Sequence, residues 1–445
     1  MVIVLQILFG LLILGVLVMI HELGHFLVAK ACKIRVLAFS VGFGKALFVK
    51  TIGETEYRIS AVPFGGYVHM AGEHPEEGHV IEPGDFNEKP IWQRALVAVA
   101  GPVANVVFSV IFLWIMFMIG VEKPQYIMHP VVGSVVQSSA AQQAGFMPGD
   151  SILSINKKSI GTWTDVQKTL TPQIKPVVVV VARHARLDTI SFTVPNISGR
   201  GLPKYPSAGL LPALPALVGG VSNGSPAQKA GLQHNDTITF INGQTVYSWY
   251  QLTDIVVAYD SASGPLTFVV KRGAATQSIP IVPAYNAEAK RYQVGVAVAM
   301  PSTVTVRYSA LQAASGTLEK TWEYTVMIFD VLGKLIDKQV SPQQLAGPVG
   351  IVQMSGVVAM GGISSILDFM ALIGINLGVL NLLPLVITDG GLLLFLGIEA
   401  VRRKPLSITM QMRINRVAII FFVALFIYVT FNDVARIPEL LRLGR

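Results

Sequence analysis

Residues 2–25 read VIVLQILFGLLILGVLVMIHELGH, an apolar run that ends in a polar pentapeptide. The run from Val2 to Ile20 has the length and composition of a membrane-spanning helix. Within such a helix each charged side chain costs roughly 2.5–3.5 kcal/mol on insertion scales, so His21, Glu22 and His25 need a stabilising partner or a function. This stretch therefore predicts a membrane helix that carries a polar site near one end.

The pentapeptide His21-Glu22-Leu23-Gly24-His25 has the spacing of a zinc site. On a helix, its two histidines lie one turn apart and present their rings on the same face. Neutral imidazole nitrogens suit Zn²⁺, and a catalytic zinc keeps one position open for water. Glu22 would then activate the zinc-bound water as a general base and later protonate the leaving amine. The alternative, in which these side chains only reach toward the lipid headgroups, explains neither their spacing nor their identity.

Three more apolar runs predict membrane helices, at Ala95 to Val121, Phe369 to Ile387 and Val417 to Phe431. The composition agrees, since 52% of the 445 residues are apolar and 13% are charged. The first run has no basic residue before it and no small-residue cleavage pattern after it. We therefore expect it to stay in the protein as a helix rather than to be removed as a signal peptide.

Basic residues flank the membrane runs and predict their orientation. One group follows the first run and another precedes the fourth, which places both segments in the cytoplasm: Lys30, Lys33, Arg35, Lys45 and Lys50, then Arg402, Arg403, Lys404, Arg413 and Arg416. With four spans, both termini and the stretch from about residue 122 to 363 face the other side, which is the periplasm if this is the inner membrane of a Gram-negative bacterium. Topology and membrane lipids then explain the net charge of +8, so we expect no nucleic-acid partner.

The stretch between the second and third runs contains an internal repeat. AGFMPGDSI at residues 144–152 recurs as AGLQHNDTI at residues 230–238, and each copy continues into a β-like segment and a turn. The shared A-G-x-x-x-x-D-x-I pattern resembles the PDZ domain, which binds extended peptides or protein termini by adding a strand to its sheet. The alternative is a generic repeat of strands, turns and helices.

Residues 34–70, between the first two runs, alternate apolar and polar side chains and are punctuated by glycine, which predicts a small β-sheet. Gly42-Phe43-Gly44-Lys45 does not match a phosphate-binding loop, because the spacing is wrong and no Ser or Thr follows the lysine. A nucleotide site is therefore not expected here.

Asp389 is the other acidic residue embedded in an apolar run and is our candidate for a third zinc ligand. Pro384 before it and the pair Gly390-Gly391 after it predict a break in the helix, which is tolerable at membrane depth only when it is buried in protein or lines a wet cavity. Asn381 would supply polar contacts nearby. The alternative is that Asp389 only caps the next helix, with the glycines as a turn.

Together these motifs resemble the site-2 protease family of intramembrane zinc metalloproteases, over nearly the whole chain. The matching features are HExxH at residues 21–25, FSVGFGKAL at 39–47, GPVAN at 101–105, the two PDZ-like repeats, NxxP at 381–384 and DG at 389–390. Two positions depart from the family pattern, with Val386 in place of a second proline and Leu392 in place of a histidine. Neither is a candidate ligand, so they bear only on local shape.

The resemblance implies a role for each site residue. Zn²⁺ is held by His21, His25 and Asp389, with Glu22 as the catalytic residue. The helix-breaking motif and a membrane-associated hairpin sheet bind the unwound substrate, through Asn381, Pro384, Gly42, Phe43 and Gly44. The expected substrate is a single-pass anti-sigma factor that a first protease has trimmed, with remnant signal peptides as further candidates. Its cleavage would trigger an envelope stress response, and the PDZ pair would exclude substrates that still carry a bulky periplasmic domain.

The predicted fold is a polytopic α-helical membrane protein with four transmembrane helices, a membrane-associated β-hairpin sheet and two β-rich PDZ-like periplasmic domains. The helices occupy segments 1–33, 91–121, 363–400 and 417–445, with the sheet at 34–90, the PDZ-like domains at 122–205 and 206–300, linker helices at 301–362 and a cytoplasmic loop at 401–416. A non-catalytic membrane scaffold, whose PDZ pair captures misfolded proteins, is the alternative function. A zinc protease domain acting in water fits poorly, because HExxH directly follows a membrane span.

Overall fold

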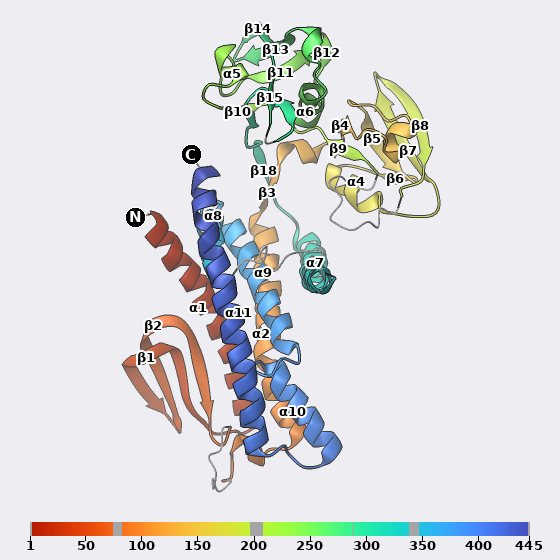
Figure 1. Cartoon of the computed structure of the whole chain (residues 1–445). Helices are drawn as coiled ribbons and strands as arrows, with labels where there is room; N and C mark the ends of the chain where they lie inside the picture. The colour runs from red at the N-terminus through yellow and green to blue at the C-terminus, as the bar shows by residue number, and fades with distance from the viewer. Residues whose placement is uncertain (1, 74–81, 196–207, 288, 338–346, 444–445) are drawn as a thin grey trace. The chain divides into compact units, whose positions relative to one another are not determined.

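The computed structural model describes residues 2–73, 82–195, 208–287, 289–337 and 347–443. The chain divides into two compact units, one made of Met1–Val121 with Arg307–Arg445 and the other of Glu122–Val306. The first unit holds the long apolar helices and the second holds the repeats (Figure 1). Each unit is described by itself.

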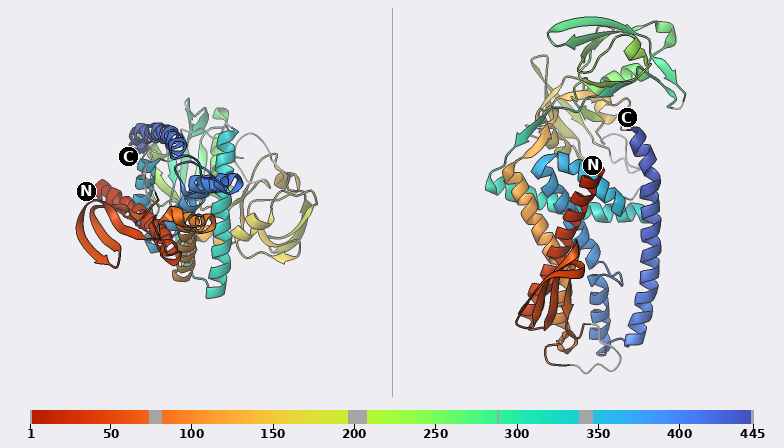
Figure 2. Two further views of the ribbon diagram at one scale, coloured as in Figure 1. Left: turned by 90° about the horizontal axis from the view of Figure 1, so that it is seen from below. Right: turned by 90° about the vertical axis from the view of Figure 1, so that its left-hand side faces the viewer.

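Four helices in the described part of the chain are long and apolar enough to cross a membrane, with spans at Ile7–Ala31, Ile91–Ile119, Gly362–Leu382 and Thr409–Ala435. The predicted count of four is therefore confirmed. These spans belong to α1 (Val2–Ala31), α2 (Ile91–Ile119), α9 (Gly362–Leu382) and α11 (Ile408–Leu443). Within the first unit, α1 begins and α11 ends at the same end, as an even number of spans requires (Figures 1 and 2).

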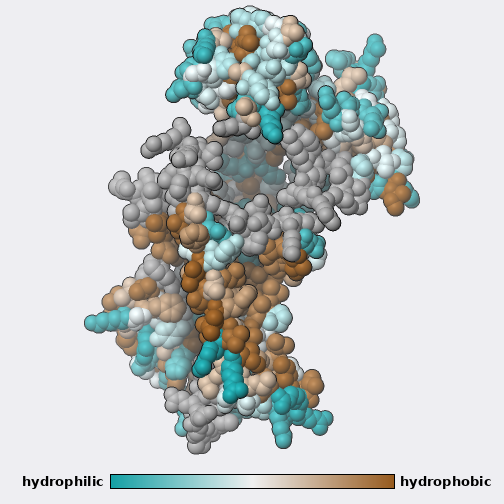
Figure 3. All heavy atoms as spheres, in the orientation of Figure 1, coloured by the Kyte–Doolittle hydropathy of each residue, from teal (hydrophilic) through white to brown (hydrophobic). Residues whose placement is uncertain are grey.

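Hydrophobic side chains gather over these helices on the face shown in Figure 3. α11 exposes a long apolar surface that includes Ile419, Ile420, Phe421, Phe426 and Ile427. Water would not tolerate such a surface, but lipid chains would. We conclude that α11 faces lipid along most of its length.

Glycines let the membrane helices approach closely around α2. A methyl group on Gly24 of α1 would lie 2.3 Å from the carbonyl oxygen of Ala100 on α2. One on Gly378 of α9 would lie 2.9 Å from the carbonyl oxygen of Pro102, also on α2. Small residues at helix crossings are a common means of packing in membranes, where burial of apolar surface gives no driving force. α2 is therefore the central helix, in contact with both α1 and α9.

The third apolar run is not one continuous helix. α9 gives way to a loop at residues 383–388, which contains Pro384, and α10 (Asp389–Arg402) follows. The predicted break is thus present, but Gly390 and Gly391 do not form it, since they lie in the first turn of α10. A methyl group on either would lie 2.0 or 2.3 Å from a carbonyl oxygen of the loop, so the two glycines allow the loop to fold against the helix.

The predicted sheet between the first two spans is present as β1 (Val36–Ile52) and β2 (Thr55–Met70), a long antiparallel pair beside α1. Residues 38–41 of β1 pair with both halves of β2, so the last part of β2 forms an edge of the sheet. β1 bends at Gly42 and Gly44, whose φ angles of 89° and 84° favour glycine. A 3₁₀ turn at Phe86–Glu88 (η1) precedes α2.

Two further helices complete the first unit, α7 (Ala310–Ile336) and α8 (Pro348–Met360). α7 lies across the direction of the membrane helices rather than along it (Figure 2). Tyr324 and Lys320 of α7 both bond to Asp368 of α9, each at 2.7 Å. Asp433 of α11 accepts hydrogen bonds from two backbone amides at the start of α8, so α7 and α8 are each tied to a membrane helix.

The second unit contains two copies of one small fold, as the repeat predicts. Each copy has a four-stranded antiparallel sheet, in the order β6-β5-β7-β8 in the first and β12-β11-β13-β14 in the second. The first copy consists of β4 (Val132–Val135), α3 (Ala140–Gln143), β5 (Ser151–Ile155), β6 (Lys158–Ser159), α4 (Trp163–Thr169), β7 (Val177–Arg183), β8 (Arg186–Phe192) and β9 (Leu210–Pro212). The second consists of β10 (Val218–Val221), α5 (Pro226–Lys229), β11 (Thr237–Ile241), β12 (Gln244–Thr245), α6 (Trp249–Val257), η3 (Ser261–Ser263), β13 (Leu266–Arg272), β14 (Ala275–Ile281), β15 (Ala284–Asn286), β16 (Arg291–Gln293) and β17 (Val296–Val298).

Each copy has its own hydrophobic core, with Trp163 buried in the first and Phe268 in the second. Leu210 belongs to the first core, and its strand β9 pairs with β4. The first domain therefore extends through Pro212, past the predicted boundary at residues 205 and 206, because the strand that closes it comes late in the chain. Outside both copies, β3 (Val121–Pro124), followed by a 3₁₀ turn (η2, Gln125–Met128), pairs with β18 (Thr303–Val306).

The aspartate of each repeat motif is buried and paired with an arginine at the end of a neighbouring strand. Asp150 bonds to Arg183, and Asp236 bonds to Arg272, each through two contacts of 2.7 Å. Each arginine also donates to the carbonyl of the motif glycine. Two-pronged pairs of this kind are the strong form of charged hydrogen bond, which explains the aspartate in the motif.

The Asp236 pair predicts how the stability of the second unit depends on pH. Burial by itself raises the pKa of Asp236, but hydrogen bonds from Arg272 and the Gln233 amide outweigh it and lower the pKa below its ordinary value of 3.8. A carboxyl whose pKa is lowered by folding adds stability above its unfolded-state pKa and loses it as the pH falls through the folded-state value. We expect the unfolding temperature to fall as the pH is lowered below about 4, and Asp236→Asn to weaken this dependence. Thermal unfolding across a pH series measures both, and equal slopes in the two proteins would contradict the prediction.

Candidate metal centre

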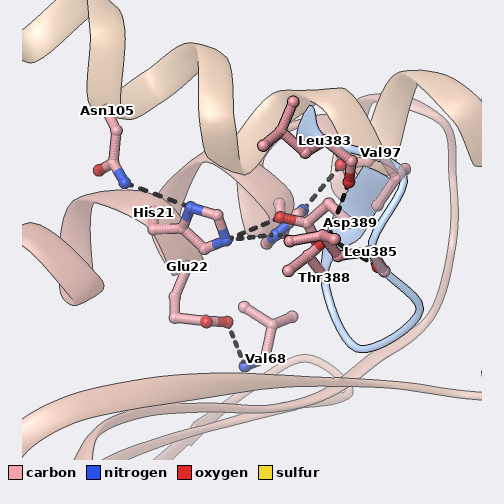
Figure 4. A network of polar contacts seen from close by, with 10 residues as sticks. His21, Glu22, Val68, Val97, Asn105, Leu383, Leu385, Thr388 and Asp389 are labelled. Atoms are coloured by element: carbon pink, nitrogen blue, oxygen red, sulfur yellow. Dashed lines mark hydrogen bonds and ion pairs between the residues drawn. The ribbon is translucent and has the colours of Figure 1, made fainter. Parts of the chain in front are cut away.

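Three side chains from distant parts of the sequence meet where α1, α2 and the start of α10 come together (Figure 4). Nε2 of His21 lies 3.1 Å from Nε2 of His25 and 3.1 Å from Oδ2 of Asp389. Nε2 of His25 lies 3.4 Å from Oδ1 of the same carboxylate. Both histidines are 9% exposed, so the protein encloses most of the cluster.

The spacing and chemistry of these three residues fit a zinc ion. Ligand atoms at about 2.0–2.2 Å from a tetrahedral zinc stand roughly 3.3–3.6 Å from one another, close to the 3.1–3.4 Å observed here. Two imidazoles and one carboxylate would leave a fourth position open, as catalytic zinc sites do. Thr388 rather than Asp389 is the N-cap residue of α10, so Asp389 does not merely cap that helix.

α2 holds the ring of His25 in place. Nδ1 of His25 lies 2.7 Å from the carbonyl oxygen of Val97, to which it donates its proton. Nε2 is then the unprotonated nitrogen and faces the other ligands, which is how histidine ligands are usually oriented. Gly101, one turn further along α2, lies against both rings, since a methyl group there would be 2.4 Å from Nε2 of His25 and 2.8 Å from Cε1 of His21. Any larger side chain would displace the two rings.

Asn105 of α2 contacts the second histidine. Its Nδ2 lies 3.3 Å from Nδ1 of His21, and the residue is 1% exposed. Its Oδ1 is buried and has no hydrogen-bond partner among the described residues. Turning the amide by 180° would bring Oδ1 to the N–H on Nδ1 of His21. That orientation satisfies the buried oxygen and leaves Nε2 of His21 unprotonated, as a zinc ligand must be.

Glu22 extends from α1 toward the sheet rather than into the cluster of ligands (Figure 4). Its Oε2 accepts a hydrogen bond of 3.1 Å from the backbone N–H of Val68. Val68 lies in the last part of β2, which is the edge of the sheet. The carboxylate therefore adjoins both the two histidines and a strand edge.

The loop before α10 presents Asp389. The hydroxyl of Thr388 donates to the carbonyl oxygens of Leu383 and Leu385, at 3.1 and 2.8 Å, and so closes the loop on itself. Val386 lies in this loop, and Leu392 packs against a core cluster next to α1. With these two residues in place, the carboxylate of Asp389 still lies 3.1 and 3.4 Å from the histidine nitrogens.

The other predicted site residues lie at two separate places. Asn381 is in the last turn of α9 and Pro384 is exposed in the following loop, whereas Gly42, Phe43 and Gly44 form the bend of β1. The hydrogen bonds to the two histidines come instead from Val97 and Asn105, and the one to Glu22 comes from Val68. The sequence assigned no role to these three residues. The GPVAN motif was the signal that could have pointed to Asn105 and Gly101.

A buried histidine, histidine and aspartate cluster within a bundle of membrane helices defines a membrane-embedded zinc metalloprotease. The chain belongs to peptidase family M50, whose model matches residues 9–425. It is 34% identical to Protease RseP of Yersinia pestis and to Regulator of sigma-E protease RseP of Escherichia coli K12, and 31% identical to a putative zinc metalloprotease of Vibrio cholerae. Each comparison covers 95% of this chain and 97% of the relative. The predicted family, enzyme class and zinc cofactor are confirmed, and a purely non-catalytic scaffold is disfavoured.

Proposed function

We propose that this protein cuts single-pass membrane proteins within their membrane segments, with zinc held by His21, His25 and Asp389 and with Glu22 as the general base. The observation that carries the proposal is the meeting of two histidines of the first membrane helix with Asp389, at the start of the helix that follows the third span. Glu22 lies between the two histidines in the sequence. When bound, zinc polarises the scissile carbonyl and makes water more acidic. The chain's own groups account for the remaining chemistry.

Glu22 is positioned to take a proton from the attacking water and to return it to the leaving amine. The N–H of Val68 keeps the carboxylate in one orientation, at 3.1 Å. Because Val68 belongs to an edge of the sheet, a substrate strand added there would pass next to Glu22. A membrane helix must unwind before its peptide bonds can be reached, and strand addition replaces the hydrogen bonds that it loses.

The remaining predicted contacts concern substrate binding. Gly42, Phe43 and Gly44 lie in the same sheet, and Phe43 is 45% exposed, so its ring is available to a bound segment. Asn381, in the last turn of α9, and the exposed Pro384, in the loop that follows, lie shortly before Asp389 in the sequence. We propose that both places contact the unwound substrate on its way to the zinc ligands.

The name of the Escherichia coli relative, Regulator of sigma-E protease RseP, supports a substrate class linked to sigma-E. We propose a pre-trimmed single-pass anti-sigma factor, with remnant signal peptides as a second class. We also propose a bacterial inner membrane location, which the four spans and the similarity to the RseP relatives support. The basic residues after the first run and before the fourth support a periplasmic position for both termini and for the PDZ-like domains, where these domains would bind peptides or protein termini.

The direct test is cleavage of a model single-pass substrate by the purified protein in detergent, with mass spectrometry of the products. We expect a cut inside the hydrophobic segment, which a zinc chelator abolishes and added zinc restores. Binding without any cut, under conditions in which the protein retains zinc, would contradict the proposal and favour a scaffold.

The pairing of β3 with β18 offers a precise way to test the PDZ-like domains. The backbone N–H of Gln125 donates to the carbonyl of Ser302 at 2.8 Å, so Gln125 and Ser302 can be joined by a short Gly-Ser linker in place of residues 126–301. We expect this variant to cleave a full-length substrate that the intact protein leaves uncut, while both cleave a pre-trimmed substrate equally. Unchanged selection between the two substrates would rule out a role for the domains as a size filter.

A further inference from the structure

An ion pair joins α2 to α10. It lies away from the proposed zinc ligands, near the start of α2 and near the end of α10. Nη1 and Nη2 of Arg94 donate to the two carboxylate oxygens of Glu399, at 3.1 and 2.5 Å. The Nε of Arg94 donates to the carbonyl of Lys89 at 3.0 Å, so every nitrogen of the guanidinium has a partner. The two side chains are 10% and 15% exposed, which makes this a largely buried, two-pronged pair.

Each charge interacts unfavourably with the dipole of its own helix. Arg94 lies in the first turn of α2, where the helix dipole favours negative charge, and Glu399 lies in the last turn of α10, where the dipole favours positive charge. Burial adds a desolvation penalty to both. The helix dipoles and the desolvation penalty therefore both disfavour these charges. The ion pair between the two helices is the interaction that offsets this cost.

The pair shares a helix face with the groups that build the metal centre. On α2, Arg94 is followed at helical spacing by Val97, Gly101 and Asn105, which contact the two histidines. On α10, Glu399 lies on the side that also carries the buried Leu396 and, at the opposite end, Asp389. α2 thus positions two ligands, and α10 supplies the third.

We propose that Arg94 and Glu399 are positioning residues, which hold α10 against α2 so that Asp389 stays within reach of His21 and His25. The inference rests on the proposed ligand set. α10 is attached to the preceding helix only by an irregular loop, and its contact with α2 has to fix its direction. A small rotation of α10 about the loop would move the carboxylate of Asp389 away from the histidine nitrogens, since ligand distances tolerate only a few tenths of an ångström.

Zinc retention tests the proposal without any measurement of cleavage. The full-length protein with Glu22→Gln, purified in detergent, is titrated with a chelator, and the apparent zinc affinity is compared among variants. We expect Glu399→Gln and Arg94→Gln to weaken zinc binding by about 10–100-fold, the range for residues that orient metal ligands. The exchanged double variant, Arg94→Glu with Glu399→Arg, should recover most of the loss, because the exchanged charges suit both helix dipoles.

The ion pair of Lys320 and Asp368, which joins α7 to α9, provides the matched control. Asp368→Asn removes a charged contact between two helices of the same unit and should leave zinc affinity unchanged. Arg94→Lys, which keeps the charge but loses the two-pronged geometry, should lie between wild type and Arg94→Gln and serves if the stronger variants do not fold. Unchanged zinc affinity in folded Glu399→Gln and Arg94→Lys proteins would overturn the proposal, as would an exchanged variant that regains thermal stability without regaining zinc. Asp389→Asn distinguishes a failure of this inference from a failure of the proposed ligand set. If the Asp389→Asn protein retains zinc fully, the proposed ligand set is wrong.

Discussion

Replacing Glu22 with Gln is expected to reduce the rate of substrate cleavage by about 10²–10⁴-fold, the usual contribution of a general base. Glutamine keeps the size and polarity of the side chain but cannot accept the proton of the attacking water. Since Glu22 bonds to Val68 and not to the histidines, the change should leave the ligand cluster intact. Initial rates with a purified single-pass substrate, together with the zinc content of both proteins, measure the effect.

The control for this change is Glu323→Gln, which removes an exposed carboxylate from α7. It should cleave at the wild-type rate. A Glu22→Gln protein that retains zinc and also cleaves within about threefold of wild type would exclude Glu22 as the base, because such a ratio is far below the contribution of proton transfer.

Changing Asp389 to Asn should abolish cleavage and release zinc. The amide has the shape of the carboxylate, but it lacks the negative charge that faces the two histidines at 3.1 and 3.4 Å. We expect zinc affinity to fall by more than the roughly 10–100-fold that follows loss of a residue outside the ligand set. Chelator competition gives the affinity, and cleavage at increasing zinc concentration shows whether excess metal restores activity.

Asp368→Asn again provides a comparison, since it alters an aspartate of α9 that bonds to Tyr324 and Lys320. It should keep its zinc and its activity. If Asp389→Asn and Asp368→Asn proved indistinguishable from wild type in zinc affinity, the third ligand would have to come from elsewhere in the chain.

The features that sequence predicted well are those that depend on composition or short spacing. Four long apolar runs, a nonapeptide repeat and the HExxH spacing each act within one segment, and each is present in the structure as a span, a domain or part of the metal centre. Asp389 could also be singled out, because an acidic residue within an apolar run requires a partner. This signal is local, so it does not depend on how far Asp389 lies from the histidines in the sequence.

The features that sequence did not reveal depend on how separate segments pack. Val97 and Val68 contribute backbone groups, so their side chains carry no sign of their role. Arg94 and Glu399 are charged residues near helix ends, and only the contact between α2 and α10 makes them partners. Likewise, the extension of the first domain to Pro212 becomes evident only from the pairing of β9 with β4.

The proposed metal centre would take two ligands from the first membrane helix and one from the helix that follows the third. A ribosome adds about 5–20 residues per second, so Asp389 is made tens of seconds after His25. Throughout that interval the growing chain lacks the third proposed ligand. With that ligand set, the order of synthesis would delay the appearance of proteolytic activity until nearly the whole membrane unit has been produced.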